Sequence, residues 1–134
     1  TRTFTFGEVD PELIRIGEIV LEANRAARQM GKAGLAAGAV DRAARSVITS
    51  AGYGHAFFHR TGHGLGMEAH EEPYIYSEND LILSPGAAFT IEPGIYLPGK
   101  GGVRIEDDVI VTEEGLLSLT DLPRQVLPLE TLID

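Results

Sequence analysis

Two stretches in the N-terminal half repeat their apolar residues with the period of a helix. In the first stretch, residues three or four apart fall on one face: Leu13, Ile16, Val20, Asn24 and Ala27. Asp10 can accept hydrogen bonds from the free amides of the first turn, and Pro11 suits the first helical position. The pattern predicts a helix over residues 11–30 that ends at Gly31.

The second helical stretch follows a connector of small residues, GKAGLAAG, at positions 31–38. Its apolar residues again share one face: Val40, Ala43, Ala44, Val47, Ile48 and Ala51. We expect this helix to stop at Gly52. At the start of the chain, TRTFTF alternates threonine with arginine or phenylalanine, which predicts a strand over residues 1–6.

Beyond Gly52, β-branched runs alternate with Pro-Gly and Gly-Gly dipeptides, which is typical of strands joined by turns. The order of a strand, two helices and a β-rich half predicts an α+β domain. The helices should pack on one face of a mainly antiparallel sheet. With 134 residues, 43% of them hydrophobic, and no internal repeat, we expect one domain with its own core.

The formal net charge of −9 narrows the range of partners. Nucleic-acid phosphates and anionic membrane surfaces are repelled on average, so we expect neither as a partner. No apolar run is long enough to cross a bilayer, and there is no cysteine for disulfides, thiolate metal sites or a thiol nucleophile. These features fit a protein of the reducing cytoplasm.

The strongest turn signal is PGKGG at positions 98–102, which separates FTIEPGIYL from VRIEDDVIV. A hairpin centred near Gly99 places Glu92 opposite Glu106. Pro93 cannot donate to a ladder and therefore marks an edge or a bulge, where side chains are often directed into sites. Strand alternation puts Arg104, Glu106 and Asp108 on one face of the strand. It puts Val103, Ile105 and Val109 on the other face.

Two ionised carboxylates about 4 Å apart repel each other by roughly 4 kcal/mol at an effective dielectric near 20. The Glu92–Glu106 pair is therefore costly without a shared proton or a cation. Arg104 or a lysine could neutralise the pair, or the two side chains could splay into solvent. A bound metal ion is the alternative.

Three of the four histidines stand in HRTGHGLGMEAHE, residues 59–71, with glycines between them. This stretch lacks the spacing of a phosphate-binding loop, and it lacks the glutamate of a helical zinc motif. The glycines suit an extended backbone that approaches another surface closely. Imidazole and carboxylate groups together suit manganese, cobalt, iron or zinc. His55 has no companion motif, and we expect it to be structural.

Three motifs, HRTGHGLGMEAHEEP, FTIEPGIY and GGVRIEDDVIVTEEG, occur in this order and resemble the C-terminal part of the pita-bread metallopeptidases. The resemblance is to the branch of Xaa-Pro dipeptidases (prolidases) and aminopeptidases P, and it extends over nearly the whole chain. The spacings His63 to Glu92 and Glu92 to Glu106 are similar to those of prolidase-like members. Methionine aminopeptidases share the fold, but VRIEDD around Glu106 resembles the proline-specific branch.

The resemblance implies a site for two divalent metal ions, manganese or cobalt first, with zinc or iron also suitable. His63 and Glu92 would be ligands of one metal, and Glu106 would bridge the two. Glu92 would also shuttle the proton of the attacking water while the metals polarise the scissile carbonyl. The implied reaction is hydrolysis of the bond before proline in a peptide substrate.

The resemblance also implies roles around the metals. His59 and His70 would contact the substrate and steady the tetrahedral intermediate, and Arg104 would orient the acidic ligands. Metal-free pita-bread binding modules and creatinase-like hydrolases remain the alternative class. Such relatives typically lose ligand residues, whereas all three ligand positions are intact in this chain.

The five ligands of the family include two aspartates, the second directly upstream of a TRTF-like stretch. Because the chain starts at Thr1, we expect residues 1–134 to be the C-terminal portion of a single pita-bread domain with three of five ligands. Asp10 and Asp41 are no substitutes, since the first is predicted to cap a helix and the second lies within one. The longer gene product is expected to be the enzyme. The isolated chain is expected to bind no metal, to be inactive, and to form a homodimer that covers its exposed face.

Overall fold

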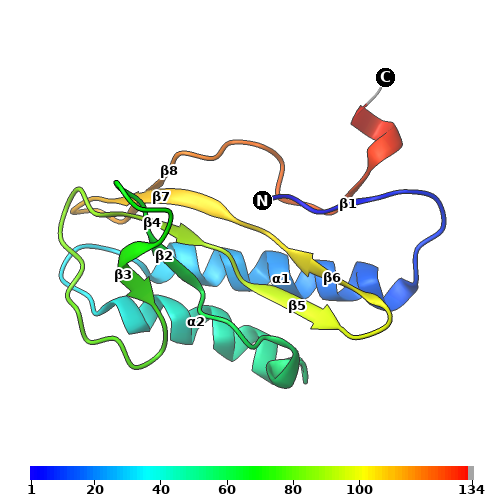
Figure 1. Ribbon diagram of the computed structural model, residues 1–134, viewed down its shortest axis with the longest axis horizontal. Coiled ribbons are helices and arrows are strands. Elements are labelled where there is room, and N and C mark those ends of the chain that lie inside the picture. The colour runs from blue at the N-terminus through cyan, green and yellow to red at the C-terminus, as the bar shows by residue number, and fades with distance from the viewer. Residues whose placement is uncertain (133–134) are drawn as a thin grey trace.

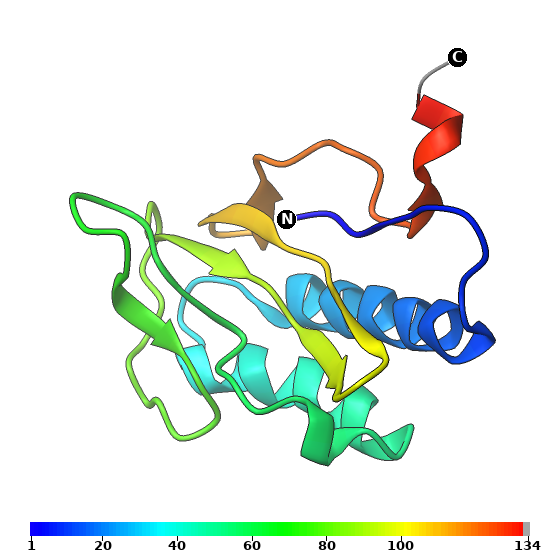
Figure 2. The same ribbon diagram turned by 45° about the vertical axis from the view of Figure 1, so that its right-hand side comes forward.

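The computed structural model describes residues 1–132 of the chain. Helices α1 (Pro11–Met30) and α2 (Ala37–Ser50) pack against each other and lie on the same side of the strands (Figures 1 and 2). Asp10 accepts a hydrogen bond from the backbone N–H of Glu12, as expected for a helix cap. Both ends of α1 therefore agree with the prediction from the sequence.

Helix α2 begins at Ala37, inside the segment predicted to be a connector. Among the described residues, no side chain caps its first turn. The N–H groups of Ala37 and Gly38 instead donate to the carbonyls of Leu81 and Asn79, at 2.9 and 2.8 Å. A distant loop thus supplies the acceptors that a local cap would otherwise provide, which the local sequence could not reveal. The helix stops before Gly52, whose φ of 89° is left-handed, as predicted.

The main sheet has five strands in the order β3-β2-β4-β7-β8, and every neighbouring pair is antiparallel. Its strands are β2 (Gly62–Gly64), β3 (Glu71–Ile75), β4 (Ala88–Ile91), β7 (Asp107–Val111) and β8 (Leu116–Ser118). An antiparallel pair, β5 (Gly94–Leu97) and β6 (Gly101–Arg104), forms the end of the hairpin. The predicted α+β class, with both helices on one face of mainly antiparallel sheets, is confirmed.

The first strand differs from the prediction over residues 1–6. Only β1 (Phe4–Thr5) is a strand, and it pairs in parallel with β9 (Leu127–Pro128) near the other end of the described chain. Two short 3-10 helices complete the structure, η1 (Gly54–Ala56) and η2 (Leu129–Leu132). The strand is shorter than predicted because its partner is a two-residue segment that lies far away in the sequence.

The hairpin register agrees with a turn centred near Gly99. Ile95 pairs with Val103 between the turn and the two glutamates, Glu92 and Glu106. Ile91 pairs with Asp107 on the side of these glutamates away from the turn. Each predicted strand is nevertheless split in two, because the ladder is interrupted where Glu92 and Pro93 face residues 105–106.

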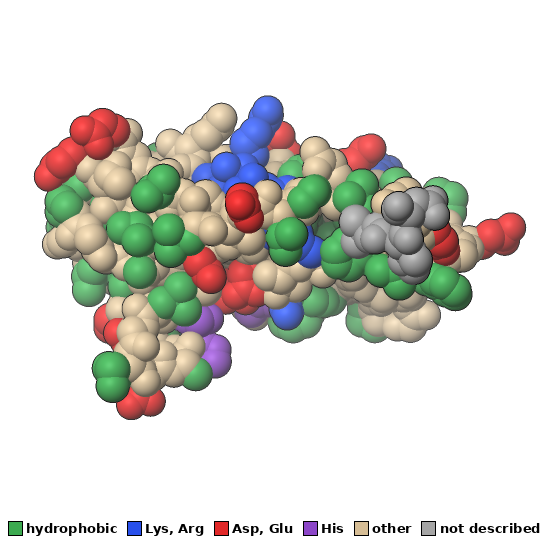
Figure 3. Space-filling view, turned by 90° about the horizontal axis from the view of Figure 1, so that it is seen from above, with side chains coloured by type: hydrophobic (Ala, Val, Ile, Leu, Met, Phe, Trp, Pro, Cys, Tyr) green, Lys and Arg blue, Asp and Glu red, His purple; other side chains and the backbone are tan. Residues whose placement is uncertain are grey.

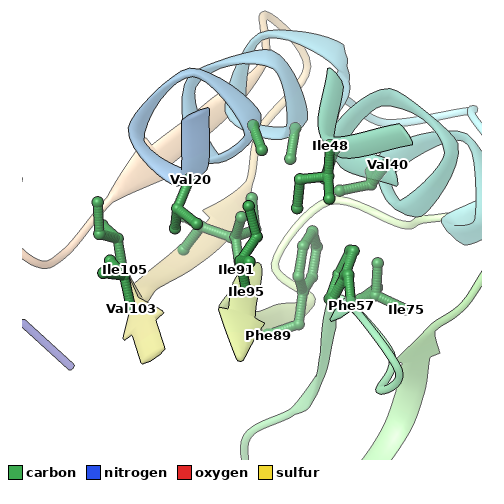
Figure 4. Close-up of a cluster of buried hydrophobic side chains, with 14 of the residues drawn as sticks. Val20, Val40, Ile48, Phe57, Ile75, Phe89, Ile91, Ile95, Val103 and Ile105 are labelled. Atoms are coloured by element: carbon green, nitrogen blue, oxygen red, sulfur yellow. The ribbon is translucent and has the colours of Figure 1, made fainter. Parts of the chain in front are cut away.

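The core lies between the helices and the sheet. Val20 of α1 and Ile48 of α2 point toward strand residues that include Ile91 and Phe89, and all four are fully buried (Figure 4). Complete burial of such a side chain stabilises the fold by about 1.5–3 kcal/mol. The predicted inward face of the second hairpin strand is confirmed by the burial of Val103, Ile105 and Val109. Within residues 1–132, neither helix is long and apolar enough to cross a lipid bilayer.

Candidate metal centre

The glycines beside His63 allow its strand to approach both neighbours. A Cβ atom at Gly62 would lie 1.7 Å from the carbonyl oxygen of Thr90, and one at Gly64 would lie 2.1 Å from that of Glu72. Any side chain at either position would push β2 away from β4 or β3. The glycines in this stretch therefore permit the close approach that the sequence predicted.

The ring of His63 is oriented by its own strand. Its Nδ1 atom lies 3.0 Å from the carbonyl oxygen of Gly64 and must donate there, which directs Nε2 toward the carboxylates. Nε2 lies 3.3 Å from Oε1 of Glu92. A neutral imidazole held in this way is the form that binds a metal ion.

Thr90 joins His63 to Glu92, a contact that the sequence did not indicate. Its hydroxyl accepts from the backbone N–H of His63 at 3.1 Å and donates to Oε1 of Glu92 at 2.9 Å. Thr90 and Glu92 are two residues apart in an extended segment, so they share a face. That spacing could have indicated a contact between Thr90 and Glu92. Threonine is too common in strands, however, for the spacing alone to single out Thr90.

Glu92 and Glu106 lie opposite each other between two paired positions of the hairpin. Their N–H groups point outward: that of Glu92 donates to the carbonyl of Thr61 at 2.7 Å, and that of Glu106 donates to the carbonyl of Thr1 at 3.0 Å. This is the arrangement of a non-hydrogen-bonded pair, in which the side chains come closest. One donor atom from each of His63, Glu92 and Glu106 lies within 4.8 Å of the other two.

Glu106 is held in its charged form. Burial alone would raise its pKa, but three groups hold the pKa of Glu106 below its ordinary value: the hydroxyl of Thr1, the ammonium group that Thr1 carries as first residue of this chain, and the charge of Arg104. Within residues 1–132, no arginine or lysine forms an ion pair with Glu92 or Glu106. Their side chains are only 18% and 21% exposed, so they do not splay into solvent either.

His59 and Arg104 meet at Tyr96, which the sequence analysis did not single out. The Nε2 atom of His59 lies 3.0 Å from the Tyr96 hydroxyl, and Nη1 of Arg104 donates to the same oxygen at 3.3 Å. Nδ1 of His59 faces the carbonyl of Arg60 at 2.7 Å. The hydrogen bond to Tyr96, with the charges of nearby acids, raises the pKa of Arg104 although burial opposes it. Its predicted role in orienting the acidic ligands stays a prediction.

A cavity of about 200 Å³ brings together the predicted residues except Glu106, which does not line it, and Figure 3 shows histidines beside carboxylates in a notch under a projecting lobe. His70 lies in the loop between β2 and β3, with its ring centroid 4.3 Å from that of His63. His55 is exposed on η1 and is not among the lining residues. The lining residues are His59, Arg60, His63, His70, Glu92 and Arg104.

Behind the carboxylates, Asp107 faces the core and is completely buried. Arg2 and Arg124 each approach one of its oxygens to 2.7 Å, and Arg28 lies 3.4 Å away. Burial alone would raise the pKa of Asp107, but its hydrogen bonds and ion pairs with Arg124 and Arg2 hold it below the ordinary value. Sequence reasoning missed this cluster, because its arginines come from both ends of the chain and from α1.

The model of metallopeptidase family M24 matches residues 1–113. The chain belongs to this family. Among M24 relatives, the probable dipeptidase PepE of Mycobacterium tuberculosis (strain ATCC 25618 / H37Rv) is 50% identical over 127 residues, which are 95% of this chain and 34% of that protein. The Xaa-Pro dipeptidase of Lactobacillus delbrueckii subsp. lactis is 45% identical over 132 residues, 97% of this chain and 36% of the relative.

Solved structures agree with the M24 assignment. A dipeptidase from Pyrococcus horikoshii OT3 superposes with a TM-score of 0.93 and 51% identity, over 96% of this chain and 36% of that one. The pita-bread fold is thereby confirmed. This M24 chain spans about a third of the length of the relatives it matches.

Membership in M24 implies divalent metal ions, and the donor set fits them. One imidazole nitrogen and two carboxylates form a mixed nitrogen and oxygen site suited to manganese, cobalt, zinc or iron. Within residues 1–132, neither a lysine nor an arginine forms an ion pair with the two glutamates, and the cation beside Glu106 is the ammonium group of Thr1, at 3.2 Å.

Proposed function

We propose that the protein containing this chain is a metal-dependent exopeptidase that hydrolyses the peptide bond before proline. The observation that carries the proposal is the convergence of His63, Glu92 and Glu106 within 4.8 Å, in a chain of family M24. A relative 45% identical to the chain is named Xaa-Pro dipeptidase, which supports proline specificity. The proposal includes two divalent ions, with manganese or cobalt preferred to zinc or iron.

The proposed chemistry divides between the ions and Glu92. Divalent ions at this site would polarise the scissile carbonyl and lower the pKa of a water molecule. Thr90 fixes Oε1 of Glu92, whereas Oε2 makes no hydrogen bond within residues 1–132. We assign to Oε2 the transfer of a proton from the attacking water to the departing amine of proline.

The proposed substrate contacts lie at the rim of the cavity. His59 lines the cavity and is oriented by Tyr96, and His70 lies beside the ring of His63. Both imidazoles are therefore placed to contact a peptide and to stabilise the charge that develops on its carbonyl oxygen. Arg104 completes this rim, and a guanidinium suits an anionic group of the substrate.

We further propose that residues 1–134 are the C-terminal portion of one catalytic domain, to which a preceding segment adds two ligand carboxylates. Thr1 lies against Glu106, so residues joined ahead of it would start beside the site. Activity, a proline-containing peptide as substrate and a cytoplasmic location belong to that longer protein, whereas the homodimer is proposed for the isolated chain. Neither nucleic acid nor a membrane surface is proposed as a partner, given the net charge of −9.

The test uses the protein at the full length of its relatives. Dialysis against a chelator should abolish hydrolysis of an Xaa-Pro dipeptide, and manganese or cobalt should restore it, with little turnover of a matched Xaa-Ala dipeptide. The alternative class, metal-free pita-bread relatives, predicts that chelation has no effect on activity. A metal-free binding module would show no hydrolysis, and a creatinase-like hydrolase would keep its activity after chelation.

A further inference from the structure

Pro93 leaves the backbone carbonyl of Ile105, on the facing strand of the hairpin, without the N–H group that would usually bond to it. The N–H of Ile105 donates to the carbonyl of Pro93 at 3.3 Å, and a regular antiparallel pair would return a bond from residue 93 to the carbonyl of Ile105. Proline has no N–H. The gap lies directly beside Glu92 and Glu106, where a change in strand separation would move both carboxylates.

The side chain of Asn24 fills this gap from α1. Its Nδ2 atom donates to the carbonyls of Ile105 at 3.4 Å and Ile91 at 3.3 Å, one on each strand of the hairpin. Asn24 is completely buried beside apolar side chains such as those of Ile91 and Ile105, which Figure 4 shows in the core. Burying an amide is costly unless all of its hydrogen-bonding groups find partners, so its presence there requires a reason.

The orientation of the amide is fixed by Arg28. Nε of Arg28 donates to Oδ1 of Asn24 at 2.8 Å and lies 3.4 Å from the buried carboxylate of Asp107. Because a guanidinium can only donate, the oxygen of the amide must face Arg28 and the nitrogen must face the two carbonyls. Every hydrogen-bonding group of this side chain is therefore satisfied.

We propose that Asn24 is a positioning residue of the metal site: its amide replaces the N–H that Pro93 lacks and holds the two carboxylate-bearing strands together at Glu92 and Glu106. This inference rests on the proposed function for its connection with metal binding. The bridge between the strands is a property of the chain itself. Glu92 and Glu106 need a fixed separation to share ions, and Asn24 supplies it from the face opposite the site.

The test is a double-mutant cycle in the protein at the full length of its relatives. Asn24→Leu keeps the approximate size of the side chain but removes the amide, and Pro93→Ala restores a backbone N–H at residue 93. Ile48→Ala on α2 is the control for a general loss of core packing. Calorimetric titration with manganese should show a loss of affinity of about 10- to 100-fold for Asn24→Leu, and wild-type affinity for Ile48→Ala.

The cycle distinguishes positioning from packing. In the Pro93→Ala background, Asn24→Leu should cost much less manganese affinity, because the N–H of residue 93 can bond to the carbonyl of Ile105. An equal loss in both backgrounds, or wild-type affinity in Asn24→Leu, would overturn the proposal.

A second measurement separates this proposal from the proposed function. In the metal-free protein, hydrogen exchange of the Ile105 N–H should be faster in Asn24→Leu than in Ile48→Ala. If the wild-type protein binds no manganese, the proposed function fails, and the exchange rates still decide the role of Asn24. Equal exchange rates in the two variants would show that Asn24 does not hold the strands together.

Discussion

At the scale of single residues, the ligand assignment makes a direct prediction. In the protein at the full length of its relatives, Glu92→Gln should lower kcat for an Xaa-Pro dipeptide by about 10²–10⁴-fold, because the carboxylate that moves the proton is gone. His63→Ala and Glu106→Gln should abolish turnover through loss of metal. His55→Ala is the matched control and should be close to wild type, since His55 is exposed outside the cavity. Substantial turnover in any of the three ligand variants would contradict the assignment.

Asp107 makes a prediction about stability and pH. Its pKa is lowered in the folded chain, so its contribution to stability is fully present above the unfolded value, about 3.9, and is lost as the pH falls through the folded value. Asp107→Asn should therefore lower the free energy of unfolding by about 3–5 kcal/mol at pH 7, because three arginines lose their buried partner. Urea titrations at several pH values measure this.

The difference between the variant and the wild type should shrink as the pH falls below about 4, where the unfolded carboxyl is already protonated. If the difference in the free energy of unfolding stays constant down to pH 2, the charge of Asp107 does not account for its contribution to stability. The sequence did not reveal this residue. An aspartate on the inward side of a strand is informative only when its cations are known, and Arg2 and Arg124 lie at opposite ends of the chain.

At the scale of elements, the position of β2 depends on Gly62. Gly62→Ala would place a Cβ atom 1.7 Å from the Thr90 carbonyl, so β2 must move away from β4 and take His63 away from Glu92. In the protein at the full length of its relatives, we expect a loss of about 1–3 kcal/mol in stability and a clear loss of manganese affinity. Thermal unfolding and calorimetric titration check the two effects.

Gly34→Ala is the control for this variant. Gly34 has a φ of 82° and no atom within 4 Å of the added Cβ, so alanine there introduces backbone strain of about 1–2 kcal/mol outside the predicted site. It should lower stability but leave manganese affinity unchanged. Equal effects of Gly34→Ala and Gly62→Ala on manganese affinity would show that the close approach of β2 to β4 does not position the metal ligands.

The elements that could be predicted from the sequence are those with local signals. Asp10, Pro11 and Gly52 set helix ends through contacts within a few residues, and the turn near Gly99 fixes the hairpin register. The start of α2 and the pairing of β1 with β9 depend on segments far away in the sequence. The split of the hairpin strands had a local signal in Pro93, but the donor that repairs it lies on α1.

At the scale of the whole molecule, the isolated 134-residue chain is expected to self-associate. Large apolar side chains are exposed, among them Phe6 at 78%, Phe58 at 74% and Met67 at 97%, and within residues 1–132 the outer strands β3 and β8 leave free edges at both sides of the main sheet. A symmetric dimer would cover such surface. The net charge of −9 opposes association, but salt screens charge beyond about 10 Å at 0.1 M and does not weaken apolar burial.

Association of the isolated chain should therefore persist or strengthen as salt is raised. Light scattering in line with gel filtration measures the mass directly. A monomer at high protein and high salt concentration would mean that these exposed side chains do not form an interface.

The turn at the tip of the hairpin also has an evolutionary consequence. The register at Glu92 and Glu106 is held by the pairs on both sides of them and by the core, and the tip lies beyond β5 and β6 (Figure 1). Insertions at the tip, around Gly99, can therefore accumulate without moving the metal donors. A one-residue deletion between Glu106 and the tip would reverse the alternation and turn that carboxylate into the core. Natural selection should tolerate length variation at the tip and remove it between the tip and the donors.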